Sequence, residues 1–182
     1  YHIVIWFTND VWDVKNKGHA SVKQVREMHA YVREKINTAR PHADFQYLSQ
    51  YDMALVQSAF MGVVLMHPKN SGIRCSAKDL DDYVYFWRGI GYLLGVKDKY
   101  NMCAGNHEET LSLCQEIEHK VLMPALAHPP YDFNHMVKAF VDGMNKTSHW
   151  TVTMSVAAVL AFSMRIFQRC LQRQLSFWDM LR

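Results

Sequence analysis

The stretch Ser21-Val22-Lys23-Gln24-Val25-Arg26-Glu27-Met28-His29-Ala30-Tyr31-Val32-Arg33 carries the clearest helical pattern of the chain. Its apolar residues recur three or four positions apart, so they form one stripe along a helix. The stripe consists of Val22, Val25, Met28, Val32 and Ile36. Ser21 and Gln24 match a capping box, so we expect the helix to begin at Ser21 and to be closed by Pro41.

One histidine falls within this apolar stripe. At about 100° per residue, His29 projects within about 40° of the centre of the stripe, so it is predicted to point inward. Arg26 and Arg33 lie on the shoulder of the stripe, about 80–100° away, and both guanidinium groups can turn toward the same side. Arg26, His29 and Arg33 are therefore a candidate site.

Helical signals recur along the rest of the chain. Ser76 with Asp79, and Asn106 with Glu109, mark further helix starts, and Gly95 marks a helix end. We expect helices over about 1–12, 21–40, 45–66, 77–94, 107–127, 131–145 and 148–180. No alternating polar and apolar run is flanked by a hairpin turn. The sequence predicts an all-α fold of about six or seven helices.

Composition sets broad limits on organisation and partners. With 182 residues, 49% of them hydrophobic, the chain can bury one sizeable core, so a single domain over residues 1–182 is expected. A net charge of +3 gives no electrostatic basis for nucleic acid as the main partner.

The cysteines and the first residues bear on the compartment. Cys75, Cys103, Cys114 and Cys170 show no paired C-x-x-C spacing, which argues against a zinc ribbon, a thioredoxin motif and covalent haem attachment. Their scatter favours buried thiols in a reducing, intracellular compartment. The chain begins with Tyr1 and shows no signal peptide, so a processed chain or a fragment is expected.

The C-terminal third contains two segments relevant to membranes. Residues 150–164 carry no charge, but about fifteen residues fall short of the ~20 that span a bilayer core, so a buried helix is favoured. The segment from Arg165 to Arg182 is cationic and amphipathic. Such a segment is either a solvated helix face or a site of peripheral contact with an anionic membrane.

Missing sequence motifs and helix periodicity argue against several types of functional site. The chain lacks a Walker phosphate loop, G-x-G-x-x-G, G-x-S-x-G and H-E-x-x-H. Glu116 with His119 and Asp132 with His135 resemble half-motifs of a di-iron bundle. Glu116 and His119, however, lie roughly 140–200° from the apolar stripe of their helix, so they are predicted to face solvent.

His29, in contrast, is predicted to lie on the apolar side of its helix, as an interior site requires. A neutral imidazole on an apolar face can serve as an axial ligand of haem iron, and arginine forms bidentate bonds to carboxylates such as haem propionates. The same spacing also fits a histidine that is simply part of the core. Both interpretations are open from the residues alone.

The segment Arg26-Glu27-Met28-His29-Ala30-Tyr31-Val32-Arg33 resembles the R-x-x-H-A-x-V-R signature of the rubber oxygenase (latex clearing protein) family, which includes the endoplasmic-reticulum-bound oxygenase of mycophenolic acid biosynthesis. Further blocks resemble the same family in order and spacing: Gln50-Tyr51-Asp52-Met53 with Phe60-Met61, Tyr85-Phe86-Trp87-Arg88-Gly89-Ile90-Gly91-Tyr92-Leu93-Leu94-Gly95-Val96, and Asp98-Lys99-Tyr100-Asn101. The resemblance is good over roughly residues 12–103 and looser beyond.

The resemblance implies an all-helical, haem b-dependent oxygenase, an oxidoreductase, with His29 as the proximal iron ligand and Arg26 and Arg33 beside it. It implies dioxygen and an apolar, isoprenoid- or lipid-like substrate as partners, and a location at the endoplasmic reticulum or another membrane. In the family, polar distal-side residues lie on a helix well upstream of the signature. Here they are expected before Tyr1 or at its edge, so we expect a chain truncated on its N-terminal side and name no distal catalytic residue.

Two further residues and one alternative complete the expectations. Asp52 is either a charge at a helix start or a group that orients a site residue. Arg88 either meets a haem propionate or forms an ion pair at the surface or between helices. The alternative function is a catalytically inactive helical domain that binds an apolar ligand or a partner, at a membrane surface in one version.

Overall fold

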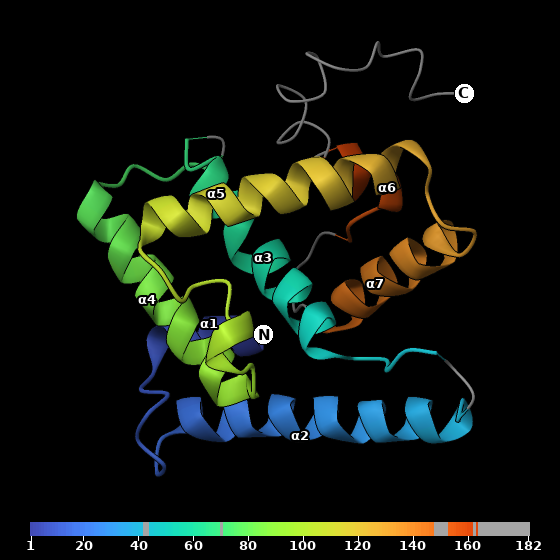
Figure 1. The fold of residues 1–182 in the computed structure, drawn as a ribbon, viewed down its shortest axis with the longest axis horizontal. Helices are drawn as coiled ribbons and strands as arrows, with labels where there is room; N and C mark the ends of the chain where they lie inside the picture. Colours follow the sequence, from blue (N-terminus) through green and yellow to red (C-terminus); the bar gives the residue numbers. More distant parts are fainter. Residues whose placement is uncertain (42–43, 70, 148–152, 162, 164–182) are drawn as a thin grey trace.

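The computed structural model describes residues 1–41, 44–69, 71–147, 153–161 and 163, and within these residues the regular structure is helical, without a strand (Figure 1). The predicted all-α class is confirmed. The α-helices are α1 (His2–Thr8), α2 (Lys17–Ala39), α3 (Gln50–Met66), α4 (Ala77–Leu94), α5 (His107–Ile117), α6 (Met123–Ala127) and α7 (Phe133–Thr147). A short 3-10 turn, η1 (Asp98–Tyr100), follows α4, and a π-helical turn, η2 (Glu118–Leu122), joins α5 to α6.

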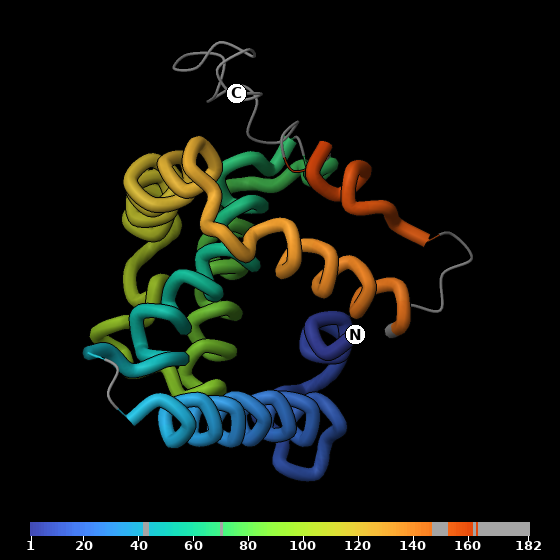
Figure 2. The backbone as a smooth tube through the Cα atoms, turned by 90° about the vertical axis from the view of Figure 1, so that its right-hand side faces the viewer, coloured from blue at the N-terminus to red at the C-terminus, as the bar shows by residue number. Residues whose placement is uncertain are grey.

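The long helices frame the molecule. α2 runs along one side, α5 with η2 and α6 runs along the opposite side, and α3 and α4 connect the two (Figure 1). α1 packs on α2, and α2 in turn packs on α4. Figure 2 shows α7 crossing the remaining side toward α1.

Most of the predicted helix ends are present, and a local capping contact or a glycine marks each of them. Capping boxes start α4 at Ser76 and α5 at Asn106, and Gly95 ends α4 in the left-handed conformation, with φ of 92°. A further capping box starts α3 at Ser49, later than the predicted start near residue 45.

The predicted start of α2 at Ser21 is wrong. The helix begins at Lys17, because the side chain of Asn16 accepts a hydrogen bond from the backbone of Gly18 at 2.9 Å and caps the first turn. Ser21 lies one turn inside the helix and is buried. Its hydroxyl group contacts α1 instead of capping α2.

The core lies where α1, α2, α3, α4 and α5 meet. It contains Trp6, Val22, Met61, Trp87 and Cys114, all buried. α3 approaches α5 closely at Gly62, where an added Cβ would lie 3.1 Å from the Sγ of Cys114. The missing side chain at Gly62 is therefore what allows the two helices to lie this close.

Some aromatic residues of the apolar helical segments are exposed. Phe60 and Tyr85 are 51% and 73% exposed. α3 is apolar on most of its surface, so periodicity does not separate its buried face from the face that carries Phe60. Tyr85 lies on the outer face of α4, opposite the buried Trp87.

Only part of the predicted C-terminal helix lies within the described residues. Residues 153–155 are not helical, whereas 156–161 are, so the predicted helix starting near 148 is wrong at least over 153–155. The segment Arg165 to Arg182 lies outside the described residues. Among the helices of the described part, none combines the length and apolar character needed to cross a membrane.

Candidate functional site

A cavity of about 430 Å³ opens between α1, α2, α3, α4 and α7. Its walls are mostly apolar, and His29 is part of them. The lining residues that matter below are Tyr1, His2, Trp6, Val25, His29, Val56, Gln57, Phe60, Trp87, Ile90, Leu94, Val96, Phe140 and Met144. The cavity therefore combines an apolar surface with a few polar groups, as small-molecule sites usually do.

His29 lies on the inward side of α2, one turn after the buried Val25, and is half-buried. Its Nδ1 atom is buried and forms no hydrogen bond within the described residues. Burial, and to a smaller degree the nearby Arg33 guanidinium, lowers the pKa of His29 below its usual value. Burial thus favours the neutral form of the imidazole.

The two arginines of the candidate site flank the cavity without lining it. Arg26 donates from Nη1 to the backbone carbonyl of Leu93 at 3.2 Å, and its guanidinium lies beside Gly95, close to Leu94 and Val96 of the cavity wall. Arg33, one turn after His29, donates from Nε to the carbonyl of Leu48 at 2.8 Å. Each guanidinium thus uses one of its five N–H groups in these contacts.

Arg88 and Asp52 are not brought to the cavity. Arg88 donates from Nη1 to the carbonyl of Ala104 at 3.1 Å and is exposed. Asp52 completes the capping box of α3, where its carboxylate accepts from the backbone N–H of Ser49 at 2.8 Å. Its geometry is that of a charge at a helix start.

Gln57 is a buried polar residue of the cavity wall that sequence reasoning missed. Its Nε2 donates to the carbonyl of Trp87 at 2.9 Å and to Asn101 at 3.0 Å, while its Oε1 accepts from the backbone of Met102 at 3.1 Å. The amide therefore ties α3 to α4 and to the turn after η1. Gly91 allows this crossing, because an added Cβ there would lie 2.6 Å from Gln57 Nε2.

His2 is a second missed residue of the cavity. Its Nδ1 lies 2.8 Å from the hydroxyl oxygen of Ser21, which also accepts a hydrogen bond from the indole N–H of Trp6 at 3.0 Å. A histidine in a short N-terminal segment gives no periodic signal that points to a site. The contact becomes visible only when α1 is packed on α2.

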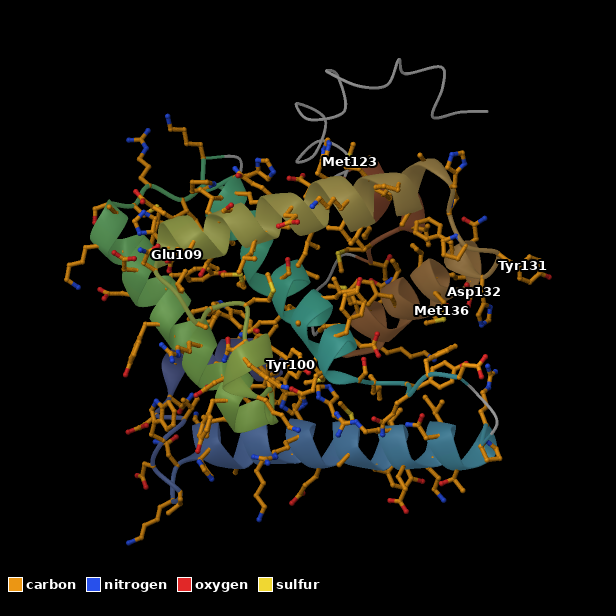
Figure 3. The ribbon with its side chains drawn as sticks, in the orientation of Figure 1. Tyr100, Glu109, Met123, Tyr131, Asp132 and Met136 are labelled. Carbon is orange, nitrogen blue, oxygen red and sulfur yellow. The ribbon has the colours of Figure 1, made fainter. Side chains whose placement is uncertain are left out.

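The di-iron half-motifs do not form a site. Glu116 and His119 are exposed, as predicted, and Glu116 pairs with Lys120 of the adjoining η2 turn. Asp132 lies at the outer end of α7 beside Tyr131, which projects away from the molecule (Figure 3). Over the part of the chain that the structure describes, no group of three or more histidine, cysteine or acidic side chains could hold a metal ion.

The model of one family, described as "ER-bound oxygenase mpaB/B'/Rubber oxygenase, catalytic domain", matches residues 2–174. The chain belongs to this oxygenase family. No curated protein and no solved structure shows a significant match to the chain.

The family match covers every element that builds the cavity of this oxygenase domain, from α1 through α7. It includes the segment with His29 and the segment around Trp87 and Gly91. An oxygenase acts on dioxygen and a second substrate, so the cavity beside His29 is the candidate active site.

Proposed function

We propose that the chain is a haem b-dependent oxygenase that uses dioxygen on an apolar, isoprenoid- or lipid-like substrate, with His29 as the proximal ligand of the haem iron. The observation that supports this most is a neutral, half-buried imidazole facing an apolar cavity, with a buried nitrogen that lacks a partner within the described residues. The oxygenase family supplies the reaction class.

The residues present fit a haem group in two respects. His29 offers an uncommitted ring nitrogen, and a buried polar atom without a partner is otherwise costly. Arg26 and Arg33 hold cationic groups on either side of His29 along α2, and the N–H groups that they do not use on Leu93 and Leu48 are suited to propionates. When bound, haem would supply the redox-active iron that dioxygen activation requires.

The chain's own residues would select and hold the second substrate. Val56, Phe60 and Leu94 present hydrocarbon surface to the cavity. Burying apolar substrate against such walls contributes roughly 25 cal/mol per Å². Because these walls are apolar, an alkene or another unsaturated chain fits this site better than a charged metabolite.

Haemin uptake by the purified full-length chain tests this proposal. We expect a Soret band at one haem per chain, which the substitution His29→Ala abolishes or shifts. His135→Ala, at an exposed histidine of α7, is the matched control and should leave the band unchanged. A folded chain that stays colourless with haemin would rule out the cofactor.

The same preparation separates the enzyme from the inactive alternative. An oxygenase consumes dioxygen when given polyisoprenoid, terpenoid or unsaturated lipid substrates. A folded chain that binds an apolar ligand but neither takes up haem nor consumes dioxygen would instead be a binding domain.

We also propose an intracellular location at a membrane surface, with Arg165 to Arg182 as the contact. The family description names oxygenases bound to the endoplasmic reticulum, and this segment is cationic and amphipathic. Co-sedimentation with anionic liposomes should be lost when the chain is truncated after Met164. Equal binding by the truncated and the full chain would refute the role of this segment.

A further inference from the structure

A second histidine shares the cavity with His29. His2 is the first residue of α1, is half-buried and lines the cavity together with Trp6, which lies one turn later on the same helix. His29 lines it from α2. The cavity therefore has an imidazole on each of two helices.

His2 is held in a defined orientation. Its Nδ1 lies 2.8 Å from the hydroxyl oxygen of Ser21, a buried residue of α2. Ser21 precedes His29 by eight residues, which corresponds to roughly 12 Å along the helix axis. His2 is thus anchored two turns away from His29, so the anchor leaves His29 free.

The contacts at Ser21 bear on which ring nitrogen of His2 carries the hydrogen. The indole N–H of Trp6 can only donate, so the oxygen of Ser21 accepts there at 3.0 Å. The hydroxyl oxygen keeps a second lone pair, so Nδ1 of His2 either accepts the Ser21 proton or donates to that lone pair. When Nδ1 accepts, a neutral imidazole carries its hydrogen on Nε2, the nitrogen that Ser21 does not contact.

Gln57, the other buried polar side chain of the cavity wall, is committed elsewhere. Both its amide nitrogen and its amide oxygen bond to groups of α4 and the following turn. His29 is assigned to the cofactor in the proposed function. Trp87 also lines the cavity, but its indole Nε1 is buried. Among the described lining residues, His2 is thus the histidine that the proposed function leaves unassigned.

We propose that the Nε2–H of His2 donates a hydrogen bond to the dioxygen that binds in the cavity. This inference rests on the proposed function and deepens it by naming the residue that stabilises the oxygen. The donor would come from α1, within the described part of the chain.

The tautomer can be measured without haem. In ¹⁵N NMR spectra of the full chain, His2 should show the Nε2–H form, and Ser21→Ala should remove this preference. His19→Gln is a matched control, because His19 is also held through Nδ1, by the carbonyl of Val11 at 2.9 Å, and does not line the cavity. A His2 ring protonated on Nδ1 in the unaltered chain would overturn the proposal.

The oxygen contact is measured with carbon monoxide on the reduced, haem-loaded chain. A donor beside the ligand lowers the C–O stretching frequency, so His2→Leu should raise it, Ser21→Ala should raise it less, and His19→Gln should leave it unchanged. Dissociation of dioxygen should become about threefold to tenfold faster in His2→Leu, as expected for the loss of one hydrogen bond.

The outcomes separate this proposal from the proposed function. Haem-loaded His2→Leu with an unchanged C–O frequency and an unchanged dissociation rate would overturn the role of His2 and leave the oxygenase intact. Loss of haem in His2→Leu, as in His29→Ala, would also overturn it, because His2 would then hold the cofactor. An unaltered chain that takes up no haemin overturns both.

Discussion

At the scale of single residues, environment decides what each side chain can do. His29 and His2 share a cavity, but one has a buried nitrogen without a partner and the other is tied to Ser21. The sequence identified His29 because it falls in a periodic stripe. It gave no comparable signal for His2 or Gln57, because their partners come from distant parts of the chain.

The cysteines show the same control by environment. Burial raises the pKa of the Cys103 thiol to about 12, and it also raises the pKa of Cys114. At pH 8 only about one Cys103 in ten thousand would be the reactive thiolate. We expect Cys103 and Cys114 to resist alkylation in the folded chain, whereas the partly exposed Cys75 reacts.

Peptide-resolved mass spectrometry after iodoacetamide treatment checks this expectation. Unfolding in guanidinium chloride should make Cys103 and Cys114 react as readily as Cys75. Equal labelling of Cys103 and Cys75 in the folded chain would mean that the thiol is not buried as described.

At the scale of elements, helix starts were predictable where the cap is local. The boxes at Ser76 and Asn106 lie within one turn of chain, and the structure has both. Ser21 has the sequence pattern of a cap, but Asn16 caps α2 instead. The hydroxyl group of Ser21 contacts His2 and Trp6 of α1, and the residue lies inside α2. A start signal read from sequence fails when tertiary contacts compete for the same hydroxyl group.

The junction of α3 and α4 provides a test at this scale. In Gly91→Ala the new methyl group would lie 2.6 Å from Gln57 Nε2, so the amide must move away from Trp87 and Asn101. Because these groups are buried, we expect a loss of about 1–3 kcal/mol in the free energy of unfolding. Urea denaturation followed by circular dichroism measures it.

Gly143→Ala is the control for this change. An added Cβ at Gly143, on α7, meets no described atom within 4 Å. Alanine should therefore stabilise the helix by about 0.5–1 kcal/mol. If both variants changed stability in the same direction and by similar amounts, the close approach at Gly91 would not be what determines the effect.

At the scale of the whole molecule, the cavity depends on long-range packing. Its walls come from residues as distant in sequence as Tyr1 and Met144. Periodicity predicts the helices and the inward direction of His29, but not which helices meet. For the same reason, Arg88 and Asp52 were reasonable candidates from sequence, yet the structure places them at Ala104 and at the start of α3.

The central claim is that His29 binds the haem iron, and the iron–nitrogen stretching band of the reduced, haem-loaded chain in resonance Raman spectra tests it most directly. We predict that the unaltered chain shows an iron–histidine band, that His29→Gly lacks it, and that added imidazole restores it. The same band in His29→Gly without imidazole would contradict the account, because another residue would then hold the iron.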